Sequence, residues 1–344
     1  GDRRYRVIGV LPAEVRGGNR AGEEGPIGVA PDGRPFGFET IEASLRPALD
    51  IRLRFADVRW FSVFRVHHRC VERFRERRCL LAGDSAHVHS PIGGQGMNTG
   101  LQDATNLAWK LAMVVEGRVD PVLLDSFEDE RLPVARGLLR TTDRLFSWVT
   151  ERSWAIRHLR LRLLPTLARR MQANPRARRA LFRRLSQIGV RYRQSRLVTP
   201  EEAPIAKAVN AMARGRLAIR SGDRLPFAMV RGQAGDGPPV ALHRYLAAPG
   251  FHLLVLDRRR DPAPIAESWG AQLLKTPVGR VTIHSFGPTS GAEDLFDVLR
   301  VESAAVLLVR PDQYLGYVST RLSLPPLLRW VEVALPTPRA AVAF

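Results

Sequence analysis

The stretch from Cys79 to Leu111 constrains the fold of this chain more strongly than any other part of the sequence. It opens with the apolar run Cys79-Leu80-Leu81-Ala82, which is typical of a short buried strand ending at Gly83-Asp84. A glycine-rich loop follows, Pro91-Ile92-Gly93-Gly94-Gln95-Gly96. Beyond the loop, apolar residues recur at helical spacing: Met97, Leu101, Ala104, Ala108, Leu111 and Val115. We therefore predict that the loop from Pro91 to Asn98 joins a strand ending near Asp84 to a helix covering Leu101–Val115.

This order of elements suits the binding of a flavin. A carboxylate at the end of a buried strand, here Asp84, points into the crevice where open α/β sheets bind ligands, and it can accept hydrogen bonds from a polyol. Glycines leave the loop backbone bare, so that a flat ring can lie against it. The free N–H groups at the start of the next helix favour the negative charge of a reduced flavin. Taken singly, each feature has an ordinary explanation, because Asp84 could cap a helix and the glycines could form a turn.

Taken together, the motifs resemble a known family. The runs are Leu80-Leu81-Ala82-Gly83-Asp84-Ser85-Ala86-His87, Pro91-Ile92-Gly93-Gly94-Gln95-Gly96-Met97-Asn98-Thr99-Gly100 and Asn106-Leu107-Ala108-Trp109-Lys110-Leu111. They are similar to the second FAD fingerprint of the class A flavoprotein monooxygenases, the aromatic hydroxylases related to para-hydroxybenzoate hydroxylase and phenol hydroxylase. The similarity is close over Cys79–Leu111 and fainter from Tyr5 to about Arg140. It implies an α/β fold with part of a Rossmann-like FAD-binding domain and an α+β substrate layer.

The resemblance also implies roles for individual residues. Asp84 would hold the ribityl chain of FAD, and Pro91 would lie beside the flavin near the substrate. Backbone groups at the start of the helix would contact the pyrimidine edge of the ring. The full set of implied cofactor-binding residues is Gly83, Asp84, Pro91, Gly94, Gln95, Gly96, Met97 and Asn98.

The implied reaction uses FAD, with NADH or NADPH as co-substrate, to transfer one oxygen atom of dioxygen to an electron-rich ring. The small aromatic substrate is expected near Phe61, Phe64 and Arg65, on the segment approaching the flavin site. Plain core packing is an equally good interpretation of the two phenylalanines. No residue is assigned a catalytic role.

Two motifs of the family have no match in the sequence. A G-x-G-x-x-G fingerprint would open the first strand–helix unit, and the middle motif would be Asp-Gly followed by Ser and Arg. Asp32-Gly33 is an isolated dipeptide that is better interpreted as a turn. The chain also starts with Gly1 directly before the strand-like Tyr5–Val10. We therefore expect a C-terminal fragment that lacks a seat for the ADP half of FAD and is inactive alone.

We divide the 344 residues into three regions. Residues 1–78 would complete a substrate-binding β region, and 79–197 would form the end of the FAD-binding domain with an arginine-rich helical segment. Residues 198–344 would form a connector and a small α/β domain. In this last region Ser221–Pro226 and Leu308–Asp312 resemble the thioredoxin-like domain of phenol-hydroxylase-type members. No cysteine follows Cys79, so this domain cannot exchange disulfides, and the resemblance implies packing or homodimer contacts.

Alternation of strand and helix patterns supports this small domain. Strands are predicted over Phe251–Leu256 and Arg280–Phe286, a helix over Glu293–Arg300, a hairpin from Ala304 to Val318 and a closing helix over Leu324–Val333.

The formal net charge is +19, and much of it lies between Arg152 and Arg196, where 14 arginines occur without an acidic residue. Such a run could bind nucleic acid or anionic lipid. We favour a solvated helical face, because Leu159, Leu163, Leu167 and Met171 have the spacing of a buried helix stripe. No nucleic-acid motif accompanies the charge, so no nucleic-acid partner is expected.

The remaining composition excludes several classes of protein. Two cysteines, Cys70 and Cys79, do not make a disulfide scaffold and are typical of a reducing cytoplasm. No apolar run is long enough to span a membrane. The histidines His67, His68, His87 and His89 match no known metal-binding spacing, so no metal site is expected.

Three functional hypotheses remain open besides a phenol-type hydroxylase. The chain could come from a polyketide-tailoring or antibiotic-modifying hydroxylase, which would share the fold and differ in the pocket. It could be a truncated flavin domain kept as a non-catalytic scaffold. It could also be a basic protein that binds nucleic acid or a membrane surface, although the composition favours this least.

Overall fold

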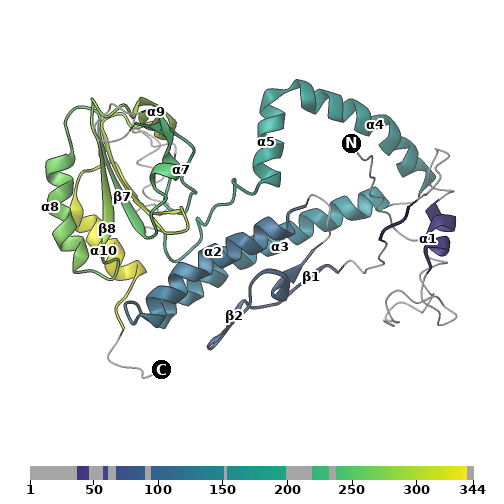
Figure 1. Ribbon diagram of the computed structural model, residues 1–344, viewed down its shortest axis with the longest axis horizontal. Coiled ribbons are helices and arrows are strands. Elements are labelled where there is room, and N and C mark those ends of the chain that lie inside the picture. The colour runs from purple at the N-terminus through teal and green to yellow at the C-terminus, as the bar shows by residue number, and fades with distance from the viewer. Residues whose placement is uncertain are drawn as a thin grey trace.

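The computed structural model describes residues 37–45, 57–60, 67–89, 94–150, 153–198, 219–231 and 238–338. The chain contains both helices and strands, with a run of long helices between two regions that contain strands, which confirms the mixed α/β fold class (Figure 1). The first elements are α1 Phe38–Leu45, β1 Arg69–Cys70, β2 Arg75–Glu76, β3 Cys79–Leu80, the 3₁₀ helix η3 Gly83–Ser85 and β4 His87–Val88. The long helices follow: α2 Gly96–Val115, η4 Pro121–Leu124 (3₁₀), α3 Asp125–Thr150, α4 Trp154–Ala173 and α5 Pro175–Leu185. The C-terminal elements are β5 Met229–Val230, β6 Val240–Ala241, α7 Leu242–Tyr245, β7 Phe251–Asp257, α8 Ala263–Leu274, β8 Val281–Phe286, α9 Glu293–Leu299, β9 Ala304–Val309, β10 Leu315–Ser319 and α10 Leu324–Ala334.

The segment before the glycine-rich loop folds into two very short antiparallel pairs. β2 pairs with β3, and β1 pairs with β4 through Arg69 opposite Val88. The predicted strand at Cys79 is therefore present, but it ends at Leu80 and is not buried, since Cys79 is exposed. Asp84 lies in η3 instead of at the end of a strand in a parallel sheet. The run Cys79–Ala82 is only four residues long, and such a run does not distinguish a hairpin edge from a buried strand.

Helix α2 runs through the predicted range and begins five residues earlier than Leu101, at Gly96. Met97 and Asn98, which we placed in the loop, form its first turn. Gly117 has a φ of +67° just beyond the helix and donates its N–H to the carbonyl of Val114, as expected for a C-terminal glycine.

The apolar stripe of α2 faces outward in the described part of the chain. Met97 is 75% exposed, Leu101 59% and Val115 73%. The buried side of the same helix instead carries four polar residues, Thr99, Asp103, Asn106 and Lys110, besides the core residues Trp109, Met113 and Val114. Regular spacing thus predicts the helix correctly, whereas it does not indicate which face is packed against the residues that the structure describes.

The short helix η4, which directly precedes α3, is capped by Asp120. The Asp120 side chain accepts a hydrogen bond from the backbone N–H of Val122 at 2.9 Å, and Pro121 occupies the first position of η4. Pro133 lies inside α3, which continues to Thr150. A proline inside a helix often kinks or breaks it, but α3 is not interrupted at this position.

The arginine-rich segment forms α4 and α5, which extend as an arm from the end of α3 (Figure 1). The buried stripe expected here is wrong for the described residues. Leu159, Leu163 and Leu167 are 53%, 51% and 53% exposed, and Met171 is only half-buried. The spacing produces a helix, but no described element packs over that side of it.

The C-terminal region contains a four-stranded sheet in the order β10-β9-β7-β8. β7 runs parallel to β8, joined by the crossover helix α8, and antiparallel to β9, which forms a hairpin with β10. These strands, α9 and α10 agree with the sequence predictions to within about two residues. The thioredoxin-like character of this region and the three proposed domain boundaries remain predictions.

Strand β7 is the centre of this sheet, and both of its faces are buried. Leu253 and Val255 join a core with α8, α10 and the Trp109 side of α2. Leu254 and Leu256 face the opposite core, which contains α9. Alternate side chains of a strand point to opposite faces, so a continuous apolar run fits a strand covered on both sides.

A pair of buried histidines lies across β7 and β8. The Nδ1 atom of His252 is 3.0 Å from Nε2 of His284, and His252 Nε2 donates to the carbonyl of Ala248 at 2.9 Å. His252 Nδ1 is therefore the acceptor, and His284 is the donor through Nε2–H. Burial, together with the neighbouring His252, lowers the pKa of His284 to about 4.

This pair predicts that the fold loses stability in mild acid. Between about pH 6.5 and pH 4, His284 is neutral in the folded state but protonated in the unfolded chain. Its contribution to the free energy of unfolding is therefore complete above about pH 6.5 and is lost as the pH falls towards 4. With allowance for solvent screening, we expect a loss of about 2 kcal/mol in the free energy of unfolding. Urea titrations at pH 7 and pH 4.5 measure it. His284→Gln should flatten the pH dependence, and the exposed His158→Gln on α4 should leave it unchanged; equal profiles for both variants would contradict the assignment.

Candidate functional site

Two glycines allow η3 to lie directly against α2. Gly83 has a φ of +59°, and a Cβ atom built on it would be 3.7 Å from the Cα of Gly100. A Cβ atom on Gly100 would in turn be 3.6 Å from the Cα of Gly83. Since Asp84 follows Gly83, this backbone contact places Asp84, whose side chain is exposed, next to the first turns of α2.

Asp103, buried on α2, holds this contact in place. Its Oδ2 atom accepts hydrogen bonds from the Gly83 N–H at 3.0 Å and from Nε2 of His87 at 2.8 Å. Its Oδ1 atom accepts from Nε of Arg131 at 2.6 Å. Burial by itself raises the pKa of Asp103, but the hydrogen bond from His87 and the charge of Arg131 outweigh it and hold the pKa below its ordinary value.

Arg131 on α3 extends the same network to the start of α2. Its guanidinium donates to the carbonyl of Thr99 at 3.2 Å and to the Tyr192 hydroxyl at 3.0 Å. The Thr99 hydroxyl donates to the carbonyl of Gln95 and accepts from the amide of Gln187 at 2.7 Å. The first turn of α2 is therefore held by buried polar contacts from two other segments of the chain.

The beginning of α2 offers backbone N–H groups to an anion. Gln95 is the N-cap residue, and its own side chain makes no capping hydrogen bond. Just before it, Gly94 has a φ of +61°, which favours glycine, and Gly96 lies against the His89 ring, 3.5 Å from a built Cβ atom. An uncapped helix N-terminus next to bare backbone is a site for negative charge.

A second buried cluster lies two turns further along α2. The Glu130 carboxylate on α3 accepts hydrogen bonds from Lys110 Nζ at 2.7 Å, from Asn106 Nδ2 at 2.6 Å and from the Ser195 hydroxyl at 2.8 Å. Arg310, at the end of β9, donates to both Glu130 oxygens, at 2.6 and 2.9 Å. The Lys110 and Glu130 side chains are completely buried.

Asp312 completes this cluster from the turn between β9 and β10. It pairs with the Arg310 guanidinium and accepts hydrogen bonds at 3.2 Å from both Asn106 and Nε1 of Trp109. Burial lowers the pKa of Lys110 to about 8, although the Glu130 carboxylate opposes this loss of charge. Burial would also raise the pKa of Glu130, but the charges of Arg310 and Lys110 hold it far below its ordinary value. This ionic cluster joins α2 and α3 to the C-terminal sheet.

Comparison with known proteins relates the chain to FAD-dependent monooxygenases. Residues 28–142 match the sequence family described as an FAD binding domain. An uncharacterized aromatic compound monooxygenase of Bacillus subtilis is 36% identical over 258 residues, covering 75% of this chain and 44% of the relative. This chain is related to the class A flavoprotein monooxygenases.

Two further proteins show the same relationship. Pentachlorophenol 4-monooxygenase of Sphingobium chlorophenolicum is 52% identical over 84 residues, covering 24% of this chain and 18% of the relative. The crystal structure of the anhydrotetracycline hydroxylase OxyS from Streptomyces rimosus superposes with a TM-score of 0.60 at 30% identity, covering 89% of this chain and 54% of that one. The chain thus spans about half the length of these two longer matches, the Bacillus relative and OxyS.

The described structure brings most of the predicted flavin-binding residues to one place. Gly83 and Asp84 lie on η3, against the N-terminal end of α2. The residues Gly94, Gln95, Gly96, Met97 and Asn98 form the approach to α2 and its first turn. Pro91 and the predicted substrate residues Phe61, Phe64 and Arg65 lie outside the described residues. Asp84 caps no helix in the described structure, because the N-cap of η3 is Ala82.

Sequence reasoning missed the residues that hold this arrangement. Asp103, Asn106 and Lys110 were within the recognised motif but received no role. Their spacing along the helix is itself a signal, since it places three polar groups on one side of α2. The partners Arg131 and Arg310 carry no such signal, because they are distant in sequence. Among the described residues no group of three or more His, Cys, Asp or Glu could hold a metal ion, and no helix is long and apolar enough to cross a bilayer.

The ionic cluster predicts a large effect for one substitution on α3. Glu130→Gln keeps the shape of the side chain but leaves Lys110 and Arg310 without their shared carboxylate. Breaking a buried pair in this way costs about 3–5 kcal/mol. The adjacent Asp129→Asn is the matched control, because Asp129 pairs with Arg196 at the surface, where ion pairs contribute at most about 1 kcal/mol. Urea unfolding of both variants makes the comparison, and a similar small loss in each would show that the cluster is not a major source of stability.

Proposed function

We propose that this chain supplies the flavin-facing part of an FAD-dependent monooxygenase that hydroxylates an aromatic substrate. The observation that carries the proposal is the uncapped N-terminus of α2, placed beside Gly83 and Asp84 by the Asp103 carboxylate. Its backbone N–H groups can stabilise the anionic pyrimidine edge of a reduced flavin. The relatives are named monooxygenases, which supports the same function. No relative or contact described above favours a role in binding nucleic acid or a membrane surface.

The residues at this site fit FAD. The exposed Asp84 carboxylate would accept hydrogen bonds from the ribityl hydroxyls, and the bare backbone around Gly94 and Gly96 would face the ring. The backbone N–H groups of Met97 and Asn98 would donate hydrogen bonds to the negatively charged edge of the flavin ring. When bound and reduced by NADH or NADPH, FAD supplies the activation of dioxygen for ring hydroxylation. The chain's own contribution is to orient the flavin through these groups and through the rigid support of Asp103.

The substrate class is an aromatic ring. By their names, relatives act on pentachlorophenol and on anhydrotetracycline, which are a single ring and a fused polycycle. Both a phenol hydroxylase and a polyketide-tailoring hydroxylase are therefore compatible. The superposition on OxyS over 89% of this chain favours the polycyclic alternative. We place the enzyme in the reducing cytoplasm, because the two cysteines are free in the structure.

The flavin role of Asp84 is testable by binding. Asp84→Ala should lower the affinity for flavin about ten- to a hundredfold, since hydrogen bonds to charged groups contribute about 1.5–3 kcal/mol. The unfolding temperature should not change. The control is Asp120→Ala, which removes the cap of η4 and should cost about 1 kcal/mol of stability without affecting flavin affinity. Quenching of flavin fluorescence and a thermal melt measure both quantities. An unchanged affinity in Asp84→Ala would exclude the cofactor role.

A second binding prediction follows from the lack of a G-x-G-x-x-G motif in the given sequence. Without a seat for the ADP half, FAD and FMN should bind this chain with affinities within about threefold of each other, a difference below about 1 kcal/mol. Both should be removed by dialysis. Parallel titrations compare them directly, and FAD binding a hundredfold more tightly than FMN would show that the chain does hold the ADP half.

A further inference from the structure

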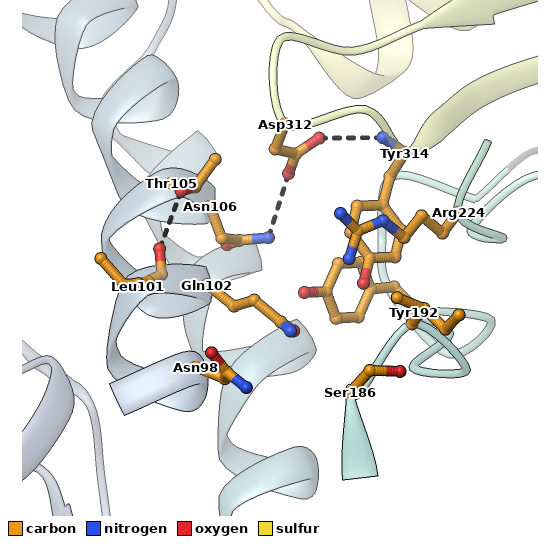
Figure 2. Close-up of a pocket in the computed structure, with 11 residues that line it drawn as sticks. Asn98, Leu101, Gln102, Thr105, Asn106, Ser186, Tyr192, Arg224, Asp312 and Tyr314 are labelled. Carbon is orange, nitrogen blue, oxygen red and sulfur yellow. Dashed lines mark hydrogen bonds between the residues drawn. The ribbon is translucent and has the colours of Figure 1, made fainter. Parts of the chain in front are cut away.

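A cavity of about 440 Å³ lies between α2, the segment from Ser186 to Tyr192 and the start of β10 (Figure 2). This volume is in the range of small-molecule pockets. It opens on the side of α2 that presents the side chains of Asn98 and Gln102, and Asn98 is the one lining residue that is also assigned to the flavin. The proposed flavin site therefore does not account for this cavity.

One wall of the cavity carries a positive charge that is not neutralised. Among the described residues, the Arg224 guanidinium has no ion pair and donates no side-chain hydrogen bond. The nearest carboxylate on the lining is Asp312, whose oxygens are already occupied by Arg310, Asn106 and Trp109. Arg224 can therefore bind an anionic ligand without breaking an ion pair with a described residue.

The neighbouring wall is aromatic and has an unsatisfied donor. The rings of Tyr192 and Tyr314 stack with their centroids 4.1 Å apart, and Figure 2 shows the Arg224 side chain beside them. Tyr314 is only 3% exposed, and its hydroxyl lies within reach of the Tyr192 hydroxyl but forms no hydrogen bond of good geometry with a described residue. A buried polar group without a partner is costly, so it favours a ligand that brings an acceptor.

The opposite wall combines amides with apolar contact. Gln102 and Asn98 project from α2 towards the two tyrosines (Figure 2). The carbonyl oxygen of Gln102 accepts a hydrogen bond from Arg131 at 3.3 Å, which leaves its NH₂ group able to donate into the cavity. Leu101 and Ile188 add apolar surface to the cavity lining.

We propose that this cavity binds a small aromatic carboxylate. The ligand carboxylate would receive the charge-assisted hydrogen bond of Arg224, and the Tyr314 hydroxyl would donate to it. Its ring would lie against Leu101 and Ile188. A guanidinium suits a planar carboxylate because its donors form a fork of matching geometry. The groups that recognise the ligand, Arg224 and Tyr314, are not part of the flavin assignment, which shares only Asn98 with this cavity, so the proposal can be tested independently of the proposed function.

Benzoate is the probe, with benzamide as its neutral counterpart of the same shape. Calorimetric titration of the full chain should give saturable benzoate binding with a Kd on the order of a millimolar, as expected for a ligand of this size. Benzamide should bind at least about tenfold more weakly, because it lacks the charge that Arg224 recognises. Equal binding of the two compounds, or no saturable binding of benzoate, would overturn the proposal.

Three variants locate the binding within the molecule. Arg224→Gln should weaken benzoate about tenfold or more and remove its advantage over benzamide. Tyr314→Phe, which keeps the stacked ring, should weaken it about threefold. Arg329→Gln, an exposed arginine on α10, is the matched control and should have no effect. Circular dichroism checks the fold of each variant. Loss of benzoate binding in Asp84→Ala with no change in Arg224→Gln would place the ligand at the flavin site and reject the cavity.

Discussion

The buried ion cluster around Glu130 is the interaction on which the arrangement of this chain depends. It takes Lys110 from α2, Glu130 from α3 and Arg310 from the end of β9, and so joins segments 180 residues apart. Buried charges are costly to desolvate, and their attraction compensates only when the geometry is good and every lone pair is used. Glu130 meets this condition through Asn106 and Ser195. Because a loss of any partner leaves a charge uncompensated, the cluster allows few alternative positions for the sheet against α2.

Helix α2 transmits this constraint to the candidate flavin site. Its buried side carries Lys110 and Asn106 at the ionic cluster, and Asp103 one turn nearer the N-terminus. Asp103 fixes η3 through Gly83 and reaches α3 through Arg131. One rigid helix thus connects the C-terminal sheet to the residues proposed to hold the flavin, because its polar groups are paired along a single side. A mobile helix end would orient a flavin poorly, and these contacts immobilise the N-terminal end of α2.

The same polar side explains why the cavity lies where it does. Arg131 donates to Tyr192, whose ring stacks on Tyr314, and Asp312 is fixed by the ionic cluster. The cavity walls are therefore held by groups that already serve the fold. On the cavity lining, Arg224 forms no ion pair with a described residue and the Tyr314 hydroxyl forms no hydrogen bond of good geometry with one. This combination of a rigid frame with unsatisfied polar groups is what a preformed ligand site requires.

The sequence alone determined the elements whose signals are local. Helix α2 and the β7–α10 succession follow from the spacing of apolar residues and from apolar runs, and the glycine-rich motif indicated the family. Tertiary structure alone decided which faces are packed: the apolar stripe of α2 is exposed while Asp103 and Lys110 are buried, and the leucines of α4 lie on the surface in the described part of the chain. Periodicity records that one face of a helix differs from the other. Which face is buried depends on partners such as Arg131 and Arg310, and their approach from distant segments leaves no trace in local sequence.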